Sequence, residues 1–382
     1  MFSVGFLTCI LGQAAPIPAL RTREALTIAP IQQVSTSNRE IAAAFAPIFY
    51  QALGDYPRGD YFTNFNFDGD WRGDNNWQNV DQKKYQLKAY VYYCVTETTT
   101  HFFIHYAVFH PRDYKGGVRR GTILSDLIRE GARRGGKYDP TGLADESALA
   151  HENDFEGCLV VVRKNGKLLA NGRVVFVETL HHNLFGKYSA SEDANKAGMV
   201  RVEENRALLY IEPRGHGIEA YDGEERQTAG KKFVIYRFAG RAEDPEARSE
   251  GTVGYELIPL QLLWSRAQSR AGKDSTYGDV KDYGTVSILV RQSDGRATER
   301  KVQIGSIGYT FLGKVGGQNM ARPPWAWFDR NNRDEPLGLW FFDPATTIKR
   351  HFGLDETFST AYVRLPFWAH KTTGVGSLES GV

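Results

Sequence analysis

Strand-forming segments recur through the middle of the chain, and they constrain its fold more than any other feature. β-Branched and aromatic side chains dominate residues 85–109, 158–169, 172–180, 206–213 and 231–238. Polar and glycine-containing turns separate these segments, and a Thr-rich turn at 97–100 predicts a β-hairpin within the first of them. Short strands joined in this way are typical of a mainly β fold, here a jelly-roll-like β-sandwich core with helical and loop insertions.

One domain is expected to hold these strands, because neither a long linker nor a repeat of fixed period divides the chain. We expect a single β-sandwich domain over residues 38–382. It contains an insertion at 114–149, where the strand pattern stops, and a less regular C-terminal part at 242–382.

Helices are expected at a few places between the strands. Ser37 and Glu40 have capping-box spacing ahead of an apolar run, which predicts a helix from Asn38 that ends by Pro47. Apolar residues at helical spacing or helix-start signals predict further helices within the insertion, at 257–266 and after Pro344.

The first twenty residues, 1–20, contain an apolar stretch at 4–11 followed by small residues. This pattern predicts either a secretory signal, and therefore a secreted, extracellular protein, or an N-terminal arm. Removal of a signal would leave Cys94 and Cys158, and these two would form one disulfide or remain as buried thiols.

The charge balance limits the partners of the protein. Its 47 basic and 45 acidic residues give a net charge of +2, without the basic excess with which proteins displace counterions from nucleic acid. We therefore expect no nucleic-acid partner. Nothing in the sequence indicates an oligomeric state.

A cluster of charge precedes the apolar run at 158–162. The stretch 150–157 reads AHENDFEG, and strand alternation places Asp154 and Glu156 on one face. His151 reaches the same side if the chain turns there. Two carboxylates and an imidazole would be held together by a divalent cation. Oxygen-rich ligation suits Ca²⁺, Mg²⁺ or Mn²⁺ better than Zn²⁺ or Fe, although the last two are also compatible.

The alternative to a metal site is an ordinary surface turn. In that case Glu152 and Asn153 are exposed loop residues, and His151 and Glu156 form pairs with arginines elsewhere in the chain.

A second segment, 106–113 with the sequence YAVFHPRD, changes the weight of these alternatives. Together with AHENDFEG it resembles the NLP family (necrosis- and ethylene-inducing-like proteins), whose hallmarks are YxWYxPKD and then GHRHDWE leading into a VVVW-type strand. Tyr106, Pro111 and Asp113 match the first motif. The family's divalent-cation ligands lie at its conserved Asp, His, Asp and Glu positions, so the resemblance implies the metal ligands Asp113, His151, Asp154 and Glu156.

The departures from the family motifs are equally specific. Phe109, Arg112 and Phe155 replace Tyr, Lys and Trp, while Glu152 replaces Arg and Asn153 replaces the second His. The loop between the motifs is also much longer than in the family. The resemblance therefore implies the architecture and the cation site of the family more than its lytic, cytolysin-like action on plant membranes.

Three further histidines follow predicted strands. A looser resemblance links 208–221, LLYIEPRGHGIEAY, to uncharacterised proteins named after a vacuolar protein sorting factor, which share the pattern VYIE..GHG.Y. His181, His182 and His216 are candidate catalytic or metal-binding residues, the alternative for each being a hydrogen-bonded loop residue. His105 and His110 are weaker candidates, because a strand would simply bury them.

Two other clusters admit alternatives. Asp68, Asp70 and Asp74 have a spacing loosely similar to calcium loops, and either a structural calcium site or an Asx-rich turn explains them. The aromatic residues near the C-terminus form a stacking platform for sugar rings or a membrane-interface anchor if exposed, and core if buried. They are Trp325, Trp327, Trp340 and Phe341.

These observations predict a divalent-cation-binding, NLP-like β-sandwich protein that recognises a membrane or glycan-type ligand. Its partners would be a small molecule, a lipid or a glycan, with peripheral membrane contact as one form of binding. The competing hypothesis is a metal-dependent enzyme of hydrolase, lyase or cyclase type that uses the same acidic and histidine-lined cleft. Motifs of the common nucleotide-binding and serine-nucleophile enzymes do not occur in the sequence.

Overall fold

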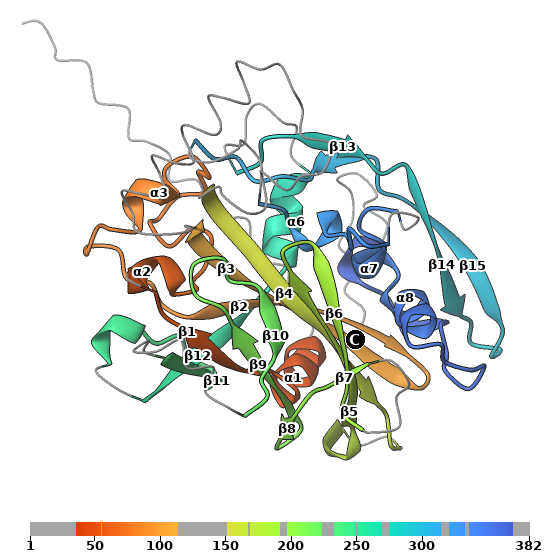
Figure 1. Ribbon diagram of the computed structural model, residues 1–382. Helices are drawn as coiled ribbons and strands as arrows, with labels where there is room; N and C mark the ends of the chain where they lie inside the picture. The colour runs from red at the N-terminus through yellow and green to blue at the C-terminus, as the bar shows by residue number, and fades with distance from the viewer. Residues whose placement is uncertain are drawn as a thin grey trace, which may run out of the picture. The chain divides into compact units, whose positions relative to one another are not determined.

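Fifteen of the strands form one large, curled mixed sheet (Figure 1). From one edge to the other, its main path runs through β10 (Ile218–Ala220), β9 (Arg206–Ile211), β1 (Ile48–Ala52), β11 (Phe233–Phe238), β12 (Thr252–Pro259), β2 (Tyr90–Thr98), β3 (His101–Asp113), β4 (His151–Arg163), β5 (Arg173–His181), β6 (Leu184–Ser189) and β7 (Gly198–Met199). The predicted fold class, mainly β with helical insertions, is confirmed.

The remaining strands lie beside this path. β8 (Val202–Glu203) pairs with β9, β17 (Tyr362–Arg364) pairs with β2, and β14 (Thr285–Arg291) connects β17 to β15 (Ala297–Gln303). A separate two-stranded sheet consists of β13 (Val280–Asp282) and β16 (Ser306–Gly308).

The helices are short. The α-helices are α1 (Thr36–Ala44), α2 (Pro57–Asp60), α3 (Asn76–Asn79), α6 (Gln261–Ala267), α7 (Leu339–Phe342) and α8 (Pro344–His351). Single 3₁₀ turns occupy η1 (Leu169–Asn171), η2 (Pro245–Ala247), η3 (Pro324–Ala326) and η4 (Phe367–Ala369). No helix in the described ranges is long and apolar enough to cross a membrane.

The computed structural model describes residues 36–54, 56–113, 151–166, 169–191, 197–223, 233–248, 251–268, 276–314, 321–332 and 336–369. Residues 35–382 form one compact unit. The expected signal or arm at 1–20 and the insertion at 114–149, with its helix, lie outside the described residues.

The curl of the sheet brings its two ends together. β10, at one end of the path, contacts β4, β5 and β6 near the other end. Because each strand twists, a long sheet of this kind folds back on itself and buries a core between its two halves, as two layers of a sandwich do. The same curl carries the loop between β9 and β10 to the face of β4, where the charged residues lie.

The local predictions hold with a few shifts. The hairpin predicted within 85–109 is β2 and β3, joined at Thr99 and Thr100. The first helix begins at Thr36, two residues before the predicted start. The helix predicted at 257–266 was placed too early, because Leu257 pairs with Val91 of β2 in a parallel ladder before the chain turns into α6.

The aromatic residues near the C-terminus are core. All four are at most 1% exposed: Trp325, Trp327, Trp340 and Phe341. They therefore cannot serve as a stacking platform or a membrane anchor, and the alternative that they are core is confirmed. Each indole N–H has a partner: Trp325 donates to the Gly308 carbonyl at 2.7 Å, Trp327 to the Arg322 carbonyl at 2.8 Å, and Trp340 to Glu178 Oε2 at 2.7 Å. Fully hydrogen-bonded indoles can be buried at little polar cost.

Cys94 and Cys158 are free and buried thiols. Cys94 pairs in register with His105, and Cys158 pairs with Tyr106, the next residue of β3. Successive residues of a strand point to opposite faces, so the two sulfurs lie on opposite sides of the sheet and form no disulfide. Burial raises the pKa of the Cys94 thiol to about 12.

A buried histidine of the core predicts a pH-dependent stability. Burial lowers the pKa of His105 to about 4, although its Nε2 lies 3.1 Å from the Trp340 carbonyl. Between pH 6.5 and 4 the unfolded chain binds a proton at this residue and the folded chain does not. We expect the free energy of unfolding to fall by about 3 kcal/mol over that interval through His105 alone. Urea unfolding at pH 7 and pH 4 should show a smaller pH dependence for His105→Gln, and an equal dependence would contradict the assignment.

Candidate functional site

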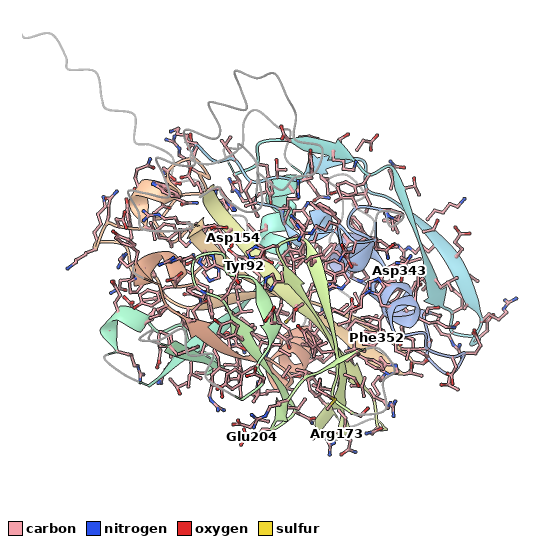
Figure 2. The ribbon with its side chains drawn as sticks, viewed as in Figure 1. Tyr92, Asp154, Arg173, Glu204, Asp343 and Phe352 are labelled. Atoms are coloured by element: carbon pink, nitrogen blue, oxygen red, sulfur yellow. The ribbon has the colours of Figure 1, made fainter. Side chains whose placement is uncertain are left out.

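The charged stretch at 151–156 lies inside β4 rather than ahead of it. β4 begins at His151 and pairs antiparallel with β3, with Asp113 opposite His151, His110 opposite Asp154 and Val108 opposite Glu156. Asp154 lies toward the end of the sheet far from Arg173 (Figure 2). The β3–β4 ladder thus brings both halves of the predicted motif to one end of the sheet.

Glu152 and Asn153 are buried, so the surface-turn alternative is wrong about them. Glu152 Oε1 and Oε2 each accept a backbone N–H at 2.7 Å, from Trp77 and Lys314. Asn153 is 0% exposed, and its Nδ2 donates at 2.8 Å to the carbonyls of Gly73 and Leu312. These residues, at which the sequence departs from the NLP motif, tie β4 to two neighbouring loops.

Asn153 also explains how His151 reaches the acidic side. Its φ is +59°, in the left-handed region that Asn tolerates better than most residues. The turn allows His151 Nδ1 to donate to the Asn153 carbonyl at 2.6 Å, while Nε2 faces Asp113 Oδ2 at 3.3 Å. Burial alone would lower the pKa of His151, but Asp113 and Asp154 outweigh it and raise the pKa to about 9.

Glu156 is the least compensated acid of the group. It is 6% exposed, and its Oε2 has no hydrogen-bond partner among the described residues. Burial raises its pKa well above the usual range, and the carboxylates of Asp154, Glu212 and Asp113 raise it further, while the His182 backbone N–H bonds to it and lowers it. A buried carboxyl in the field of three others needs a proton or a cation nearby.

Asp154 forms an ion pair with the buried side chain of His216. His216 Nδ1 lies 2.8 Å from Asp154 Oδ2, and His216 Nε2 lies 3.4 Å from Asp60 Oδ1. Burial alone would lower the pKa of His216, but the two carboxylates raise it to about 10. Asp60 in turn accepts the backbone N–H groups of Gly54 at 2.6 Å and Arg214 at 2.7 Å.

The imidazole of His216 stacks on that of His110, with ring centroids 3.7 Å apart and planes at 4°. His110 Nε2 lies 3.2 Å from Gln51 Oε1. Burial, and then the charge of His216, lower the pKa of His110 well below its usual range. The stack therefore consists of one protonated and one neutral ring.

His181 and His182 meet Glu212 instead of His151. His182 Nε2 contacts Glu212 Oε1, and His181 Nε2 lies 3.8 Å from Glu212 Oε2. His181 Nδ1 faces Glu219 Oε1 at 3.2 Å. Both histidines point toward one carboxylate because His182 begins a tight turn and does not continue the alternation of β5.

Two groups of three residues in the described part of the chain have ligand atoms that all lie within 4.8 Å of one another. They are His110, Asp154 and His216, and His181, His182 and Glu212. The set predicted from the sequence lies at the same end of β3 and β4, but its four side chains form neither of these groups. Sequence reasoning missed Glu212, Glu219 and Asp60. The first two lie within the segment 208–221, whose pattern was the available signal.

The acidic turn is held by protein donors. Asp68 Oδ2 accepts from Asn79 at 2.6 Å, and Asp70 Oδ1 accepts the Arg72 backbone N–H at 2.7 Å. Asp74 pairs with Arg72 at 2.9 Å and with Lys314 at 3.1 Å. These bonds favour the Asx-rich turn over the calcium loop.

No protein-family model matches the sequence, and no curated protein matches it. Among solved structures, the non-toxic HaNLP3 protein is 12% identical, with a TM-score of 0.29 over 63% of this chain and 85% of that chain. Necrosis and Ethylene inducing Protein 2, from the causal agent of cocoa's Witches Broom disease, is 14% identical, with a TM-score of 0.26 over 48% and 68%. NLPPya in complex with glucosamine is 13% identical, with a TM-score of 0.33 over 65% and 88%. This is a distant structural relation to the NLP fold, and it says nothing about the ligands of the present chain.

Proposed function

We propose that the protein binds a divalent cation between Asp113, His151, Asp154 and Glu156, and that the bound cation recognises a glycan or a lipid head group. Ca²⁺ or Mg²⁺ suits three carboxylates and one imidazole best, with Mn²⁺, Zn²⁺ and Fe as further candidates. The protein would act as a secreted recognition module, in contact with a membrane or a glycan-bearing surface.

Glu156 carries this proposal. Its buried Oε2, which has no hydrogen-bond partner among the described residues, and the carboxylates of Asp113 and Asp154 form a donor set with excess negative charge. His216 neutralises Asp154 and Asp60 from one side, whereas within the described ranges no cationic side chain pairs with Glu156. A divalent cation would supply the missing charge and the missing ligand contact together.

The expected ligand follows from coordination number. Ca²⁺ takes six to eight oxygen ligands, more than these four side chains provide with one atom each. Vicinal hydroxyls of a sugar or oxygens of a phosphate group would complete the shell. Both ligands would offer an oxygen-rich, exposed head group. Binding experiments distinguish a sugar from a lipid.

Asp113 and Asp70 provide a matched pair of variants. We expect Ca²⁺ or Mg²⁺ to raise the melting temperature of wild type and of Asp70→Asn, and chelator to reverse the rise. Asp113→Asn should lose most of this response, because it removes a charged ligand but retains a polar partner for His151. Thermal unfolding with each ion, together with metal analysis of the purified protein, measures this.

The ligand class is tested on the cation-loaded protein. Glucosamine and mannosamine, the sugars named for two of the remote structures, and anionic vesicles are the first probes, each with cation and with chelator. Cation-dependent binding of the sugars supports the glycan branch, and cation-dependent binding of vesicles supports the lipid branch. A wild type that carries no divalent ion and is unaffected by chelator contradicts the cation proposal itself.

A metal-dependent enzyme is the second candidate. The observation that favours it is the contact of the His182 backbone with Glu156, which places two further histidines beside the acidic centre as acid–base groups. Turnover of ester, phosphoester or glycoside substrates that chelator abolishes and Asp113→Asn reduces would favour this candidate over a binding protein.

A further inference from the structure

We propose that His181, His182 and Glu212 form a second metal site, which binds a transition metal of the zinc class beside the acidic centre around Glu156 and shares no ligand with the cation site proposed there. Two imidazoles and one carboxylate are the ligand types that such ions prefer, and three protein ligands leave a coordination position open. The site around Glu156, by contrast, is dominated by carboxylate oxygens.

The three side chains lie near the spacing that one ion requires. Ligand atoms bound to one zinc-class ion at about 2.0–2.2 Å lie within roughly 4 Å of one another. Here His181 Nε2 is 3.8 Å from Glu212 Oε2, His182 Nε2 contacts Glu212 Oε1, and all three ligand atoms lie within 4.8 Å. To bind one ion, the side chains would have to rotate so that the three atoms come closer together.

Glu219 orients one of the ligands. Its Oε1 lies 3.2 Å from His181 Nδ1, so a ring proton on Nδ1 would leave Nε2, on the Glu212 side, available to bind an ion. Metal-binding histidines commonly donate their other nitrogen to a carboxylate in this way. Glu219, His181 and the proposed ion would then form a carboxylate–histidine–metal series.

Backbone choices support the same geometry. His182 and Asn183 form the two-residue loop between β5 and β6, with φ values of +49° and +61°. Such loops favour Asn-Gly, so a histidine at the first position is conformationally costly. A side chain at 215 or 217 would displace these rings, because a Cβ there would lie 2.7 Å from His182 Cε1 or 2.9 Å from the ring of His181.

Solvent access distinguishes the group of His181, His182 and Glu212 from the buried group of His110, Asp154 and His216. The side chains of His181, His182 and Glu212 are 25%, 23% and 28% exposed, so an ion and a further ligand can reach them. His110 and His216 are 0% exposed, and Asp60 already faces His216 from the side away from Asp154. The buried group is a hydrogen-bonded stack, and the partly exposed group is the one that can exchange an ion.

Cobalt titration tests the site without an activity assay. With excess Mg²⁺ present to occupy the acidic centre, we expect one equivalent of Co²⁺ to give the visible absorption of a low-coordinate histidine site, and Zn²⁺ to displace it. His182→Asn should abolish the spectrum and keep the fold, because Asn accepts the positive φ of this turn better than His. Glu219→Gln should weaken Co²⁺ binding by about 10–100-fold.

Asn183→Gly is the matched control, since it changes the same turn without removing a ligand and should bind Co²⁺ like wild type. Asp113→Asn should also retain the Co²⁺ spectrum, which separates this proposal from the proposed cation site. Absence of Co²⁺ absorption in wild type, or equally tight binding by folded His182→Asn, overturns the proposal.

Discussion

Replacing His216 with alanine is expected to lower the free energy of unfolding by about 3–5 kcal/mol, the range for a buried charge that loses its partner. His216 lies between Asp154 at 2.8 Å and Asp60 at 3.4 Å, and both His216 and Asp60 are 0% exposed. Without the imidazole, two carboxylates face a cavity in the protein interior. Urea unfolding at pH 7 measures the effect as a shift of the midpoint at an unchanged slope.

Two further variants separate charge from backbone strain. His216 has a φ of +55°, so alanine adds a conformational cost that His216→Asn largely avoids. If the lost charge pair dominates, His216→Asn should be nearly as unstable as His216→Ala. Asp154→Asn should cost less in the His216→Ala background than in wild type, because the repulsion is then already present. A His216→Ala protein within about 1 kcal/mol of wild type would contradict this role.

Glu156→Gln should have two opposite effects. In the presence of chelator we expect it to stabilise the protein by about 1–3 kcal/mol, because it removes a carboxylate whose pKa is raised by burial and by three neighbouring carboxylates. With Ca²⁺ or Mg²⁺ the same variant should lose the rise in melting temperature that wild type shows, because it removes an anionic ligand. Thermal unfolding with cation and with chelator measures both.

Glu178 offers a matched control for this experiment. It is also a buried acid, but its Oε2 accepts from Trp340 at 2.7 Å and its Oε1 lies 2.6 Å from His351 Nδ1. Glu178→Gln should therefore destabilise the protein and leave the cation response intact. If Glu156→Gln destabilised the chelated protein as Glu178→Gln does, Glu156 would be a satisfied structural residue and the proposed cation site would lose its main support.

Much of the local structure was predictable, because it depends on short-range patterns. The hairpin of β2 and β3 follows from alternation and a polar turn, and the placement of Asp154 and Glu156 on one face follows from the same period of two. The start of α6 was less predictable, since the segment 257–259 is apolar enough for either element. Its parallel partner β2 decided in favour of a strand, and nothing within the segment itself encodes that partner.

The residues of the candidate site likewise fall into those that local motifs identified and those that depend on distant segments. Residues 151–156 and Asp113 were identifiable because their chemistry is written in two short motifs, and a single strand ladder brings them together. The roles of Glu152 and Asn153 were not identifiable, because their partners, the backbones of Trp77, Lys314 and Leu312, are distant in sequence. A buried acid and an exposed acid look the same in a sequence.

The sequence by itself determined the mainly β class, the hairpin, and which acidic and imidazole groups are present for binding. Only the tertiary structure decided how they pair. The curl of the sheet brings the β9–β10 loop to β4, so that His216 meets Asp154 and Glu212 meets His181 and His182. The physical reason is that ion pairing and metal ligation depend on distances of a few ångström between atoms, and those distances are set by packing of segments that do not share a local pattern.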